Sequence, residues 1–522
     1  MPENEFEVNV SLDIPHRSPL VKQLAIREAF RERYWNDSDP IVDERLLWRA
    51  QSIRHTVHLL PGQTILELGC GSLRFTRILK AVSRRENPIT AVTFQTELPK
   101  ANEKDANIEI LIAHQLPGSL QGRQFDCIVL MDLLDRTNSA DLLSLVFDWL
   151  KPGGEVVTYE SNPWNPVHKI RWFLSRVFGS KDPRYLLSRP LLYEQFSEIG
   201  FVRVYAMFND FVFAPLTYRL VWILRNLSIL LENTPLFNRM AGSILLHGQK
   251  PPRQKVEPTV SLATHSELFK TVSVVIPCRN EEMNIEPLVR LLLALYGDYI
   301  FEIIPLDDGS TDGSREVMQR LAEEDERVRP VFRKPPNGVG RAIKEGLATA
   351  RGQWVLTMDC DFQHLLPEFR DLFDHAAQGW DVVVGSRFSR HSVLLNYPFA
   401  KIVANRAFHT MARFVFRLAH RDLTNNLKLM RREVVENLQL TQPGFAVNAE
   451  TGFQPIILGY RVLEIAISWI NRSPGMGASS FRLVKVGGGY WMVLRDMLRL
   501  RFFKSGPYKT LLRRTQKPAK EL

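Results

Sequence analysis

The sequence predicts an α/β protein made of two domains, each of alternating helices and strands. The chain of 522 residues is longer than one ordinary domain. Short apolar runs typical of buried strands alternate with helical patterns in both halves. A proline-rich, charged stretch near residues 248–258 separates them. We therefore expect an amino-terminal extension at 1–44, a domain at 45–247, a linker at 248–269, a second domain at 270–489 and a basic amphipathic tail at 490–522.

Composition narrows the class of protein. The net charge of +10 indicates an anionic partner, and the absence of a recognisable RNA- or DNA-binding module argues against nucleic acid. The cysteines lie in or beside apolar strand patterns without paired spacing; they are Cys70, Cys127, Cys278 and Cys360. This usage predicts buried, reduced thiols in a cytoplasmic protein, without zinc or disulfides. Residues 1–11 are acidic and polar, so we expect no signal peptide.

The amino-terminal half is organised around residues 64–76, which read as a strand, a glycine turn and the start of a helix. Glycines at such a turn let the backbone approach a ligand closely, and the helix amino terminus favours anionic groups. A second apolar strand, 124–132, ends in Asp132, a helix follows to residue 150, and the next strand begins at 151–157.

The motifs ELGCG, FDCIVLMD and LKPGGEVV together resemble a class I S-adenosylmethionine-dependent methyltransferase, over about residues 45–210. The resemblance implies a Rossmann-like fold that binds S-adenosylmethionine through Glu67, Gly69, Gly71, Gln95 and Asp132.

This half departs from the methyltransferase pattern at three places. Leu73 occupies the position of the third glycine in the family's glycine motif. Gln95 occupies the position of the acidic residue that binds the ribose hydroxyls, and the nearest acidic residue, Glu97, is two positions further on. The chain also has His114 where an acidic residue commonly contacts adenine; His114 and His168 are candidate bases for an oxygen or carboxylate acceptor. Two interpretations stay open, a working methyltransferase and a degenerate scaffold that binds a ligand or its neighbouring domain.

In the carboxyl-terminal half, three apolar strands are expected at 272–277, 301–306 and 353–358, with a helix at about 285–295 and another opened by 337–346. The second strand ends in Asp307 and Asp308, and the third in Asp359 and Asp361. In a parallel sheet these carboxyl ends meet at one edge, where ligands bind.

Asp359 and Asp361 are two residues apart, so in an extended chain their side chains project the same way, and the amide oxygen of Gln363 follows them. Close carboxylates repel unless a cation lies between them. An all-oxygen set suits Mg²⁺ or Mn²⁺, with coordination positions left for a diphosphate. The alternative is a pair of solvated loop aspartates.

The ordered motifs VSVVIPCRNEE, LDDGSTDGS, NGVGRAIKEG, LTMDCDFQH and VVVGSRF resemble glycosyltransferase family 2, with a GT-A fold, over about residues 270–482. The likeness is strongest to the polyprenyl-phosphate (dolichol-phosphate) mannosyl- and glucosyltransferase branch. It implies a GDP- or UDP-linked sugar donor and a metal held by Asp359, Asp361 and Gln363. The nucleotide would contact Pro277, Arg279, Glu281, Leu306, Asp308 and Cys360. The diphosphate or the acceptor phosphate would contact Arg387 and Arg472.

This half also departs from its family. Arg279 stands where an aromatic residue is usual, and the lysine that ends the family's R-x-x-G-x-S-K motif is missing, with Arg482 as a substitute.

The acceptor decides whether a general base is needed. A lipid phosphate with a second pKa of about 6 is largely anionic at neutral pH, whereas a sugar hydroxyl must lose a proton. The candidates for that base are Asp422 and Glu450, and each is as readily explained as a helix cap. Two further alternatives stay open: a glycosyltransferase with a hydroxyl acceptor, and a non-catalytic, membrane-associated assembly factor.

No apolar run reaches the ~18–20 residues that span a bilayer, so any membrane contact is expected to be peripheral, at the cytoplasmic face. Residues 211–231 are rich in Leu, Ile and Trp, and we expect them to pack on their own domain. Residues 490–517 mix aromatic residues with many arginines and lysines, a pattern typical of a helix in an anionic membrane interface.

Overall fold

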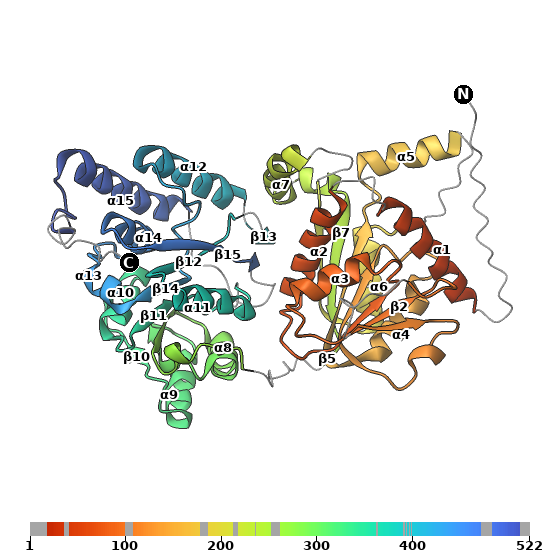
Figure 1. Ribbon diagram of the computed structural model, residues 1–522, viewed down its shortest axis with the longest axis horizontal. Coiled ribbons are helices and arrows are strands. Elements are labelled where there is room, and N and C mark those ends of the chain that lie inside the picture. The colour runs from red at the N-terminus through yellow and green to blue at the C-terminus, as the bar shows by residue number, and fades with distance from the viewer. Residues whose placement is uncertain are drawn as a thin grey trace. The chain divides into compact units, whose positions relative to one another are not determined.

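The computed structural model in Figure 1 describes residues 18–511, except 36–40, 100–107, 178–185, 212–217, 235, 252–260, 362–363, 390–391, 393, 396, 398 and 471–482. The chain divides into two compact units, Met1–Val256 and Glu257–Leu522. Each unit has its own mixed sheet and helices, which confirms the predicted α/β class.

The amino-terminal unit alternates helices and strands along most of its length. Its elements are α1 (Pro19–Tyr34), α2 (Val42–Thr56), β1 (Ile65–Leu68), α3 (Arg74–Val82), β2 (Ile89–Thr93), β3 (Ile108–Ile112), η2 (Gly118–Leu120), β4 (Phe125–Met131), α4 (Ser139–Trp149), β5 (Leu150–Ser161), α5 (Pro166–Val177), α6 (Arg189–Ile199), β6 (Val202–Asn209), α7 (Tyr218–Glu232), η3 (Phe237–Met240) and β7 (Ser243–Gln249).

Its sheet has the order β3-β2-β1-β4-β5-β7-β6, with β7 antiparallel to both β5 and β6 and the other pairs parallel. The chain passes from β1 to β2 in one direction and from β4 to β5 in the other. Right-handed crossovers therefore place α3 and α4 on opposite faces. Strand order reverses between β1 and β4, and doubly wound sheets bind ligands outside the carboxyl ends of the strands at such a point. We call this position the β1/β4 crevice.

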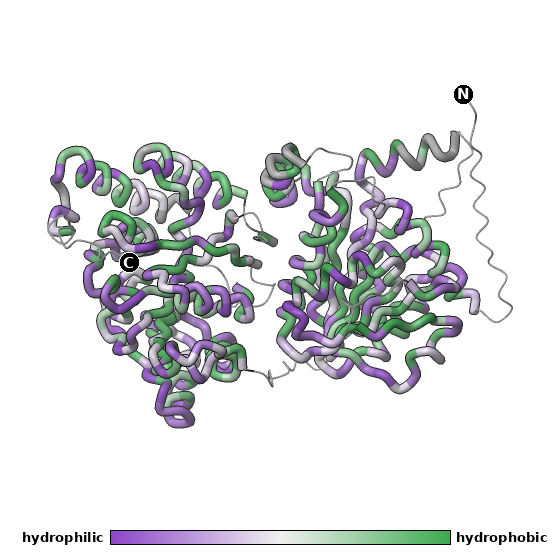
Figure 2. Tube along the Cα trace, in the orientation of Figure 1, coloured by the Kyte–Doolittle hydropathy of each residue, from purple (hydrophilic) through white to green (hydrophobic). Residues whose placement is uncertain are grey.

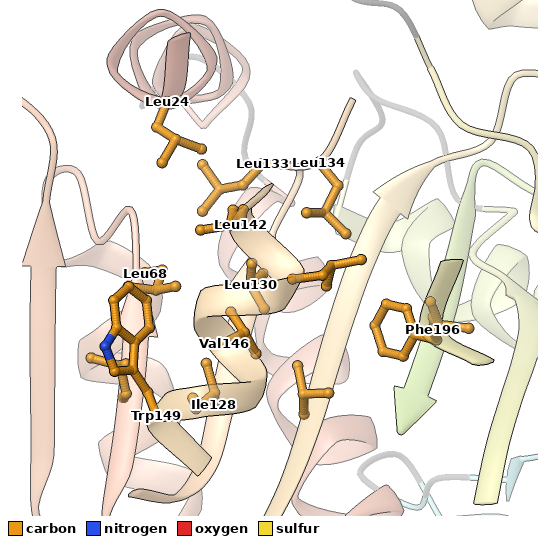
Figure 3. Close-up of a cluster of buried hydrophobic side chains, with 14 of the residues drawn as sticks. Leu24, Leu68, Ile128, Leu130, Leu133, Leu134, Leu142, Val146, Trp149 and Phe196 are labelled. Atoms are coloured by element: carbon orange, nitrogen blue, oxygen red, sulfur yellow. The ribbon is translucent and has the colours of Figure 1, made fainter. Parts of the chain in front are cut away.

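The core of this unit forms because its strands are apolar along their whole length. Every residue of β4 is buried, and Figure 2 shows the central strands as hydrophobic. Figure 3 shows Ile128 and Leu130 of β4 beside Val146 and Trp149 of α4. Leu24 of α1, which falls in the predicted extension 1–44, belongs to the same cluster. Helix α1 is thus part of this unit.

The carboxyl-terminal unit has a second set of elements. They are η4 (Ser266–Leu268), β8 (Val272–Cys278), α8 (Glu282–Tyr296), β9 (Ile300–Asp307), α9 (Ser314–Glu324), β10 (Val331–Phe332), α10 (Val339–Thr349), β11 (Trp354–Thr357), η5 (Leu366–Glu368), α11 (Phe369–Ala377), β12 (Val382–Ser386), β13 (Leu394–Leu395), α12 (Phe399–Phe416), β14 (Lys428–Arg431), α13 (Arg432–Asn437), α14 (Val447–Ile457), β15 (Val462–Ala466), β16 (Trp469–Ile470) and α15 (Leu483–Phe503).

The main sheet of this unit has the order β10-β9-β8-β11-β14-β12-β15, and β13 pairs separately with β16. Strands β8 to β11 pair in parallel, whereas β14 is antiparallel to both of its neighbours. Thr357, at the end of β11, is opposite Lys428, at the start of β14. The segment that enters β14 therefore lies at the edge where β11 and β12 end.

The predicted tail, 490–522, begins inside α15. Val493, Leu494, Met497 and Leu500 of that helix are buried in the core of the unit, and so is Tyr508 beyond it. Other α15 side chains are exposed, among them Trp491 and Phe503. The tail thus packs on its own unit through one face.

The other predicted stretch, 211–231, contains α7, whose Val221 packs with Trp48 of α2 as expected. Strand β7 continues through Gly248 and Gln249, two residues into the predicted linker. Among the described residues, no helix is both long and apolar enough to cross a bilayer.

Candidate functional site

The acids after β11 lie at the carboxyl edge of the second sheet. Asp359 and Asp361 are both half-buried, and the Nδ2 group of Asn426 donates to Asp359 Oδ1 at 2.9 Å. Gln363 and Arg472, the other predicted ligands of metal and phosphate, lie outside the described residues. Among the residues described, no three His, Cys, Asp or Glu side chains cluster as a metal site would require. The oxygen atoms of the two carboxylates are nevertheless the kind of metal ligand that Mg²⁺ and Mn²⁺ prefer.

Arg387 and Asp422 form a buried ion pair at the same edge. Arg387 Nε donates to Asp422 Oδ2 at 2.7 Å and Nη2 donates to Oδ1 at 2.9 Å. The Arg387 backbone amide adds a third hydrogen bond at 3.1 Å, and Nη1 donates to the Tyr397 hydroxyl at 3.2 Å. Such a bidentate pair fixes the guanidinium plane.

The pKa of Asp422 lies below its ordinary value of 3.8. Burial alone would raise this pKa, but the charge and hydrogen bonds of Arg387 outweigh it. A fully buried carboxylate with a lowered pKa is a poor proton acceptor. Its environment therefore supports a positioning role for Asp422 rather than the general-base role considered from the sequence.

Two further titratable groups adjoin this pair. Burial lowers the pKa of Lys428 from 10.5 to about 7, and its ammonium group donates to the carbonyls of Asn425 and Asn448. Burial also lowers the pKa of His409 on α12. His409 Nε2 accepts from the Leu423 amide at 3.0 Å, which leaves Nδ1 to donate to a carbonyl within α12. This edge of the sheet is thus held by buried polar contacts.

Asp308, the acid predicted to contact the nucleotide, is buried and engaged within the protein. Arg333 donates to Asp308 Oδ1, and the Gly338 amide donates to Oδ2 at 2.7 Å. Gly338 has a φ of +149°, and a Cβ there would overlap the carbonyl oxygen of Pro443. Asp308 therefore ties the turn before α10 to the end of β9.

The other predicted nucleotide contacts have different surroundings. Leu306 is fully buried in the core, and Cys360 is buried, as are the other three cysteines, which confirms the predicted burial of the thiols. Glu281 accepts a hydrogen bond from Asn284 at 2.7 Å. Pro277 is half-buried and Arg279 is exposed. Of this set, Pro277 and Arg279 have the most accessible side chains.

Glu450, the second candidate base, lies inside the unit. Its carboxylate accepts hydrogen bonds from the Thr441 amide at 2.9 Å, the Thr441 hydroxyl at 2.6 Å and the Gln442 amide at 3.1 Å. The Tyr508 hydroxyl adds another at 2.5 Å. Because these protein donors saturate its oxygens, Glu450 serves as an anchor for the 441–442 segment.

In the amino-terminal unit, the predicted cofactor residues lie around the β1/β4 crevice. Gly69 and Gly71 have φ angles of +72° and +50°, and Leu73, in place of the third glycine, also has a positive φ of +65°. Asp132 follows β4 and accepts from the Ser161 hydroxyl at 2.8 Å. The candidate bases do not join these residues: His114 is exposed beyond β3, and His168 Nδ1 contacts the Asn162 carbonyl at 3.0 Å.

The crevice already holds side chains from α1. Glu28 is fully buried and accepts from the Gly71 amide at 2.7 Å and from Gln95 Nε2 at 3.0 Å. Glu32 accepts from the Ser72 amide at 3.2 Å. Backbone amides that would face a bound nucleoside therefore donate to carboxylates of the same chain.

Glu67, on β1, gives a prediction on pH dependence. Burial raises its pKa from 4.5 to about 7. The folded state then holds a proton between pH 4.5 and 7 that the unfolded state releases, so stability is full below pH 4.5 and falls as pH rises through 7. We expect Glu67→Gln to remove this dependence, worth up to about 3 kcal/mol at pH 8. Opening free energies from hydrogen exchange of β1 amides would measure it; parallel pH curves for both proteins would contradict it.

Comparison with known proteins agrees with the geometry of the carboxyl-terminal unit. Residues 273–439 match the glycosyl transferase family 2 model. Polyprenol monophosphomannose synthase of Mycolicibacterium smegmatis is 29% identical over 214 residues, which is 40% of this chain and 80% of that protein. Glycosyltransferase AglD of Haloferax volcanii is 29% identical over 205 residues, 38% of this chain and 33% of that protein. The carboxyl-terminal unit therefore carries a family 2 glycosyltransferase domain.

Solved structures resemble the chain more distantly. Glucosyl-3-phosphoglycerate synthase from Mycobacterium tuberculosis, in complex with phosphoglyceric acid, aligns with 20% identity and a TM-score of 0.34, covering 48% of this chain and 81% of that one. Its complex with Mn²⁺ and uridine-diphosphate-glucose aligns with the same identity and TM-score, covering 51% and 86%.

Sequence reasoning missed three residues of these sites. Lys428 had a visible signal, a charged residue inside the apolar run Leu427–Met430. Asn426 and Glu28 had none, because their partners, Asp359 and Gly71, are far along the chain.

Proposed function

We propose that the carboxyl-terminal unit transfers a sugar from a GDP- or UDP-linked donor to a polyprenyl phosphate. The observation that carries this proposal is the state of the two candidate bases. Asp422 is committed to Arg387, and Glu450 to Thr441, Gln442 and Tyr508. An acceptor that is already an anion needs neither, which favours a phosphate over a hydroxyl. The similarity to a mycobacterial polyprenol monophosphomannose synthase supports the same acceptor.

In this reaction an oxygen of the acceptor phosphate attacks the anomeric carbon of the sugar. The bond from that carbon to the diphosphate breaks, and the nucleoside diphosphate leaves with the electron pair. Negative charge grows on the leaving group, so cations fixed in advance lower the barrier. Asp422 holds the Arg387 guanidinium at the carboxyl edge of the second sheet, so this cation need not reorganise during the reaction.

The metal is part of the same proposal. Asp359 and Asp361 would hold it, because both follow β11 and offer carboxylate oxygens, and Asn426 orients the first of them. A bound Mg²⁺ or Mn²⁺ would supply a positive charge opposite the departing diphosphate.

A screen of nucleotide sugars with Mn²⁺ or Mg²⁺ tests the acceptor. The acceptors would be a short polyprenyl phosphate and the free polyprenol of the same length, which differ by the phosphate alone. We expect product with the phosphate and none with the alcohol. Equal transfer to the alcohol would favour the hydroxyl acceptor, and no turnover of any donor would favour the non-catalytic assembly factor.

Membrane contact extends the proposal. Helices α12 and α15 pack together and expose aromatic side chains, Phe414 at 88%, Phe503 at 76% and Phe502 at 62%. Arg495 and Arg499 of α15 are more than half exposed, with side-chain values of 55% and 52%. Exposed rings beside cations suit an anionic bilayer surface, and we place the protein at the cytoplasmic face of a membrane.

We expect the protein to bind vesicles that contain phosphatidylglycerol and not to bind vesicles made of phosphatidylcholine alone. The double variant Phe502→Ser and Phe503→Ser should weaken binding by about tenfold or more, since two rings no longer leave water. Met283→Ser, which removes an apolar side chain 69% exposed on α8, is the control. Sedimentation with vesicles measures both; equal loss in the two variants would contradict this surface.

For the amino-terminal unit, the class I methyltransferase fold remains part of the proposal, and for the other unit the GT-A fold does. S-adenosylmethionine does not fit the crevice in the conformation described, because Glu28 and Glu32 take the amides beside the glycine turn. Of the two interpretations left open by the sequence, this geometry supports the scaffold, and we derive no methyl transfer from it.

A further inference from the structure

We propose that α1 is an internal ligand of the amino-terminal unit, which occupies the β1/β4 crevice in place of a nucleoside and excludes it. The crevice lies where strand order reverses, the position at which doubly wound sheets bind their ligands. Four charged residues of α1, at positions 27, 28, 31 and 32, point their side chains to the backbone around it.

Glu28 makes the contacts that a ligand's polar groups would make. Its Oε1 atom accepts from the Gly71 amide at 2.7 Å and the Thr93 hydroxyl at 3.1 Å. Its Oε2 atom accepts from the Phe94 amide at 2.9 Å and Gln95 Nε2 at 3.0 Å. One carboxylate thus joins the turn after β1 to the end of β2. Gln95 is the residue predicted to hold a ribose, and its amide nitrogen already donates to Glu28.

Glu32 fills the space above the glycine turn. A Cβ built on Gly71 would overlap the Glu32 carboxylate, while Oε2 of that carboxylate accepts from the Ser72 amide at 3.2 Å. Gly71 also has a positive φ of +50°. The missing side chain at this position lets α1 approach, and the Glu32 carboxylate takes the space beside the turn.

Two arginines of α1 bridge the ends of the strands on either side of the crevice. Arg31 Nη2 donates to the Gly69 carbonyl at 2.5 Å, after β1, and Nη1 donates to the Met131 carbonyl at 2.9 Å, at the end of β4. Arg27 Nη2 donates to the Asp132 carbonyl at 3.0 Å. Both arginines are nearly inaccessible to solvent. They close the crevice from the β4 side as Glu28 closes it from the β2 side.

The free energy of docking α1 combines a gain from burying apolar side chains with the cost of removing charged side chains from water. Val21, Leu24 and Ala25 are its buried apolar residues, and Figure 3 shows Leu24 above Leu133 and Leu134. Its buried charges add little, because the cost of removing them from water offsets their pairing. Much of what α1 offers to this site is polar, so a ligand with several hydrogen-bonding groups competes for the same amides and carbonyls.

Isothermal titration of S-adenosylmethionine into the full-length protein and into Glu28→Ala tests this competition. We expect no heat from the wild type at high micromolar ligand, and binding at least about tenfold tighter in the variant, since four hydrogen bonds to α1 are gone. Hydrogen exchange gives a readout without ligand: the Gly71 and Phe94 amides should lose protection in the variant.

Lys22→Ala is the matched control, because Lys22 is exposed on the same helix and should leave both readouts unchanged. If Glu28→Ala does not fold, Glu32→Ala, which alters a half-buried carboxylate, should strengthen binding in the same direction and deprotect the Ser72 amide. Tight binding by the wild type that Glu28→Ala weakens would overturn the proposal, since Glu28 would then grip the nucleoside. Deprotected amides without any binding would overturn it too, because α1 would not be what excludes the ligand.

Discussion

Asp361→Asn is expected to reduce sugar transfer by about a thousandfold or more, to the detection limit, while the fold is retained. Asp361 is one of two half-buried carboxylates that follow β11, and the variant replaces its charge with a neutral amide. Release of nucleoside diphosphate from the sugar donor measures the reaction, and circular dichroism checks the fold. The residual activity should require more Mn²⁺ for half saturation, which a purely structural defect would not produce.

Asp325→Asn is the control for this experiment. Asp325 pairs with Arg327 at 2.6 Å, beside the first residues of β9 and thus at the opposite end of the sheet. The control should keep its activity within about twofold, because this half-buried ion pair lies away from the carboxyl edge of the sheet. Unchanged transfer in Asp361→Asn would refute the metal assignment.

Asp422→Asn is expected to lower the unfolding free energy of the carboxyl-terminal unit by about 3–5 kcal/mol. The Arg387 guanidinium, with a side chain 12% exposed, would lose its only ion-pair partner among those the structure describes. Urea unfolding followed by circular dichroism measures this loss. Arg387→Met combined with Asp422→Leu should recover part of the stability but none of the activity, since neither partner is then left as an unpaired buried charge.

Glu436→Gln is the matched control, because its pair with Arg432 lies on the surface of α13 with side chains 62% and 41% exposed. We expect a change below about 1 kcal/mol.

The contribution of Asp422 to stability also depends on pH. Its folded pKa is lowered, so the stabilisation is present above the unfolded pKa of 3.8 and is lost as pH falls through the lower folded value. Equal losses of stability in Asp422→Asn and Glu436→Gln would contradict a stabilising role for the buried pair.

Local patterns were sufficient to predict the strands that carry the acids. The apolar runs at 272–277, 301–306 and 353–358 became β8, β9 and β11, and each ends one residue from the predicted position. Burial of a strand on both faces demands such a run, and charge can follow where the strand ends. The position of Asp359 at the sheet edge was therefore readable from the sequence.

Contacts between distant segments were not readable in this way. Strand β14 is antiparallel between two strands that precede it, and only that topology brings Asn426 to Asp359 and Asp422 to Arg387. Helix α1 falls within the predicted extension 1–44, and no sequence pattern was identified there that would have joined it to the domain. Nothing in its sequence shows that Glu28 meets the turn after β1.

The hydrogen bond from Tyr508 to Glu450 has a practical consequence for anyone who shortens this chain. A polypeptide cut at the end of α15 would lack the phenol and leave an interior anion short of a donor, although every strand of the sheet would be present. A reporter or affinity tag is better fused after Leu511, because Leu511 is itself buried in the apolar core of this unit.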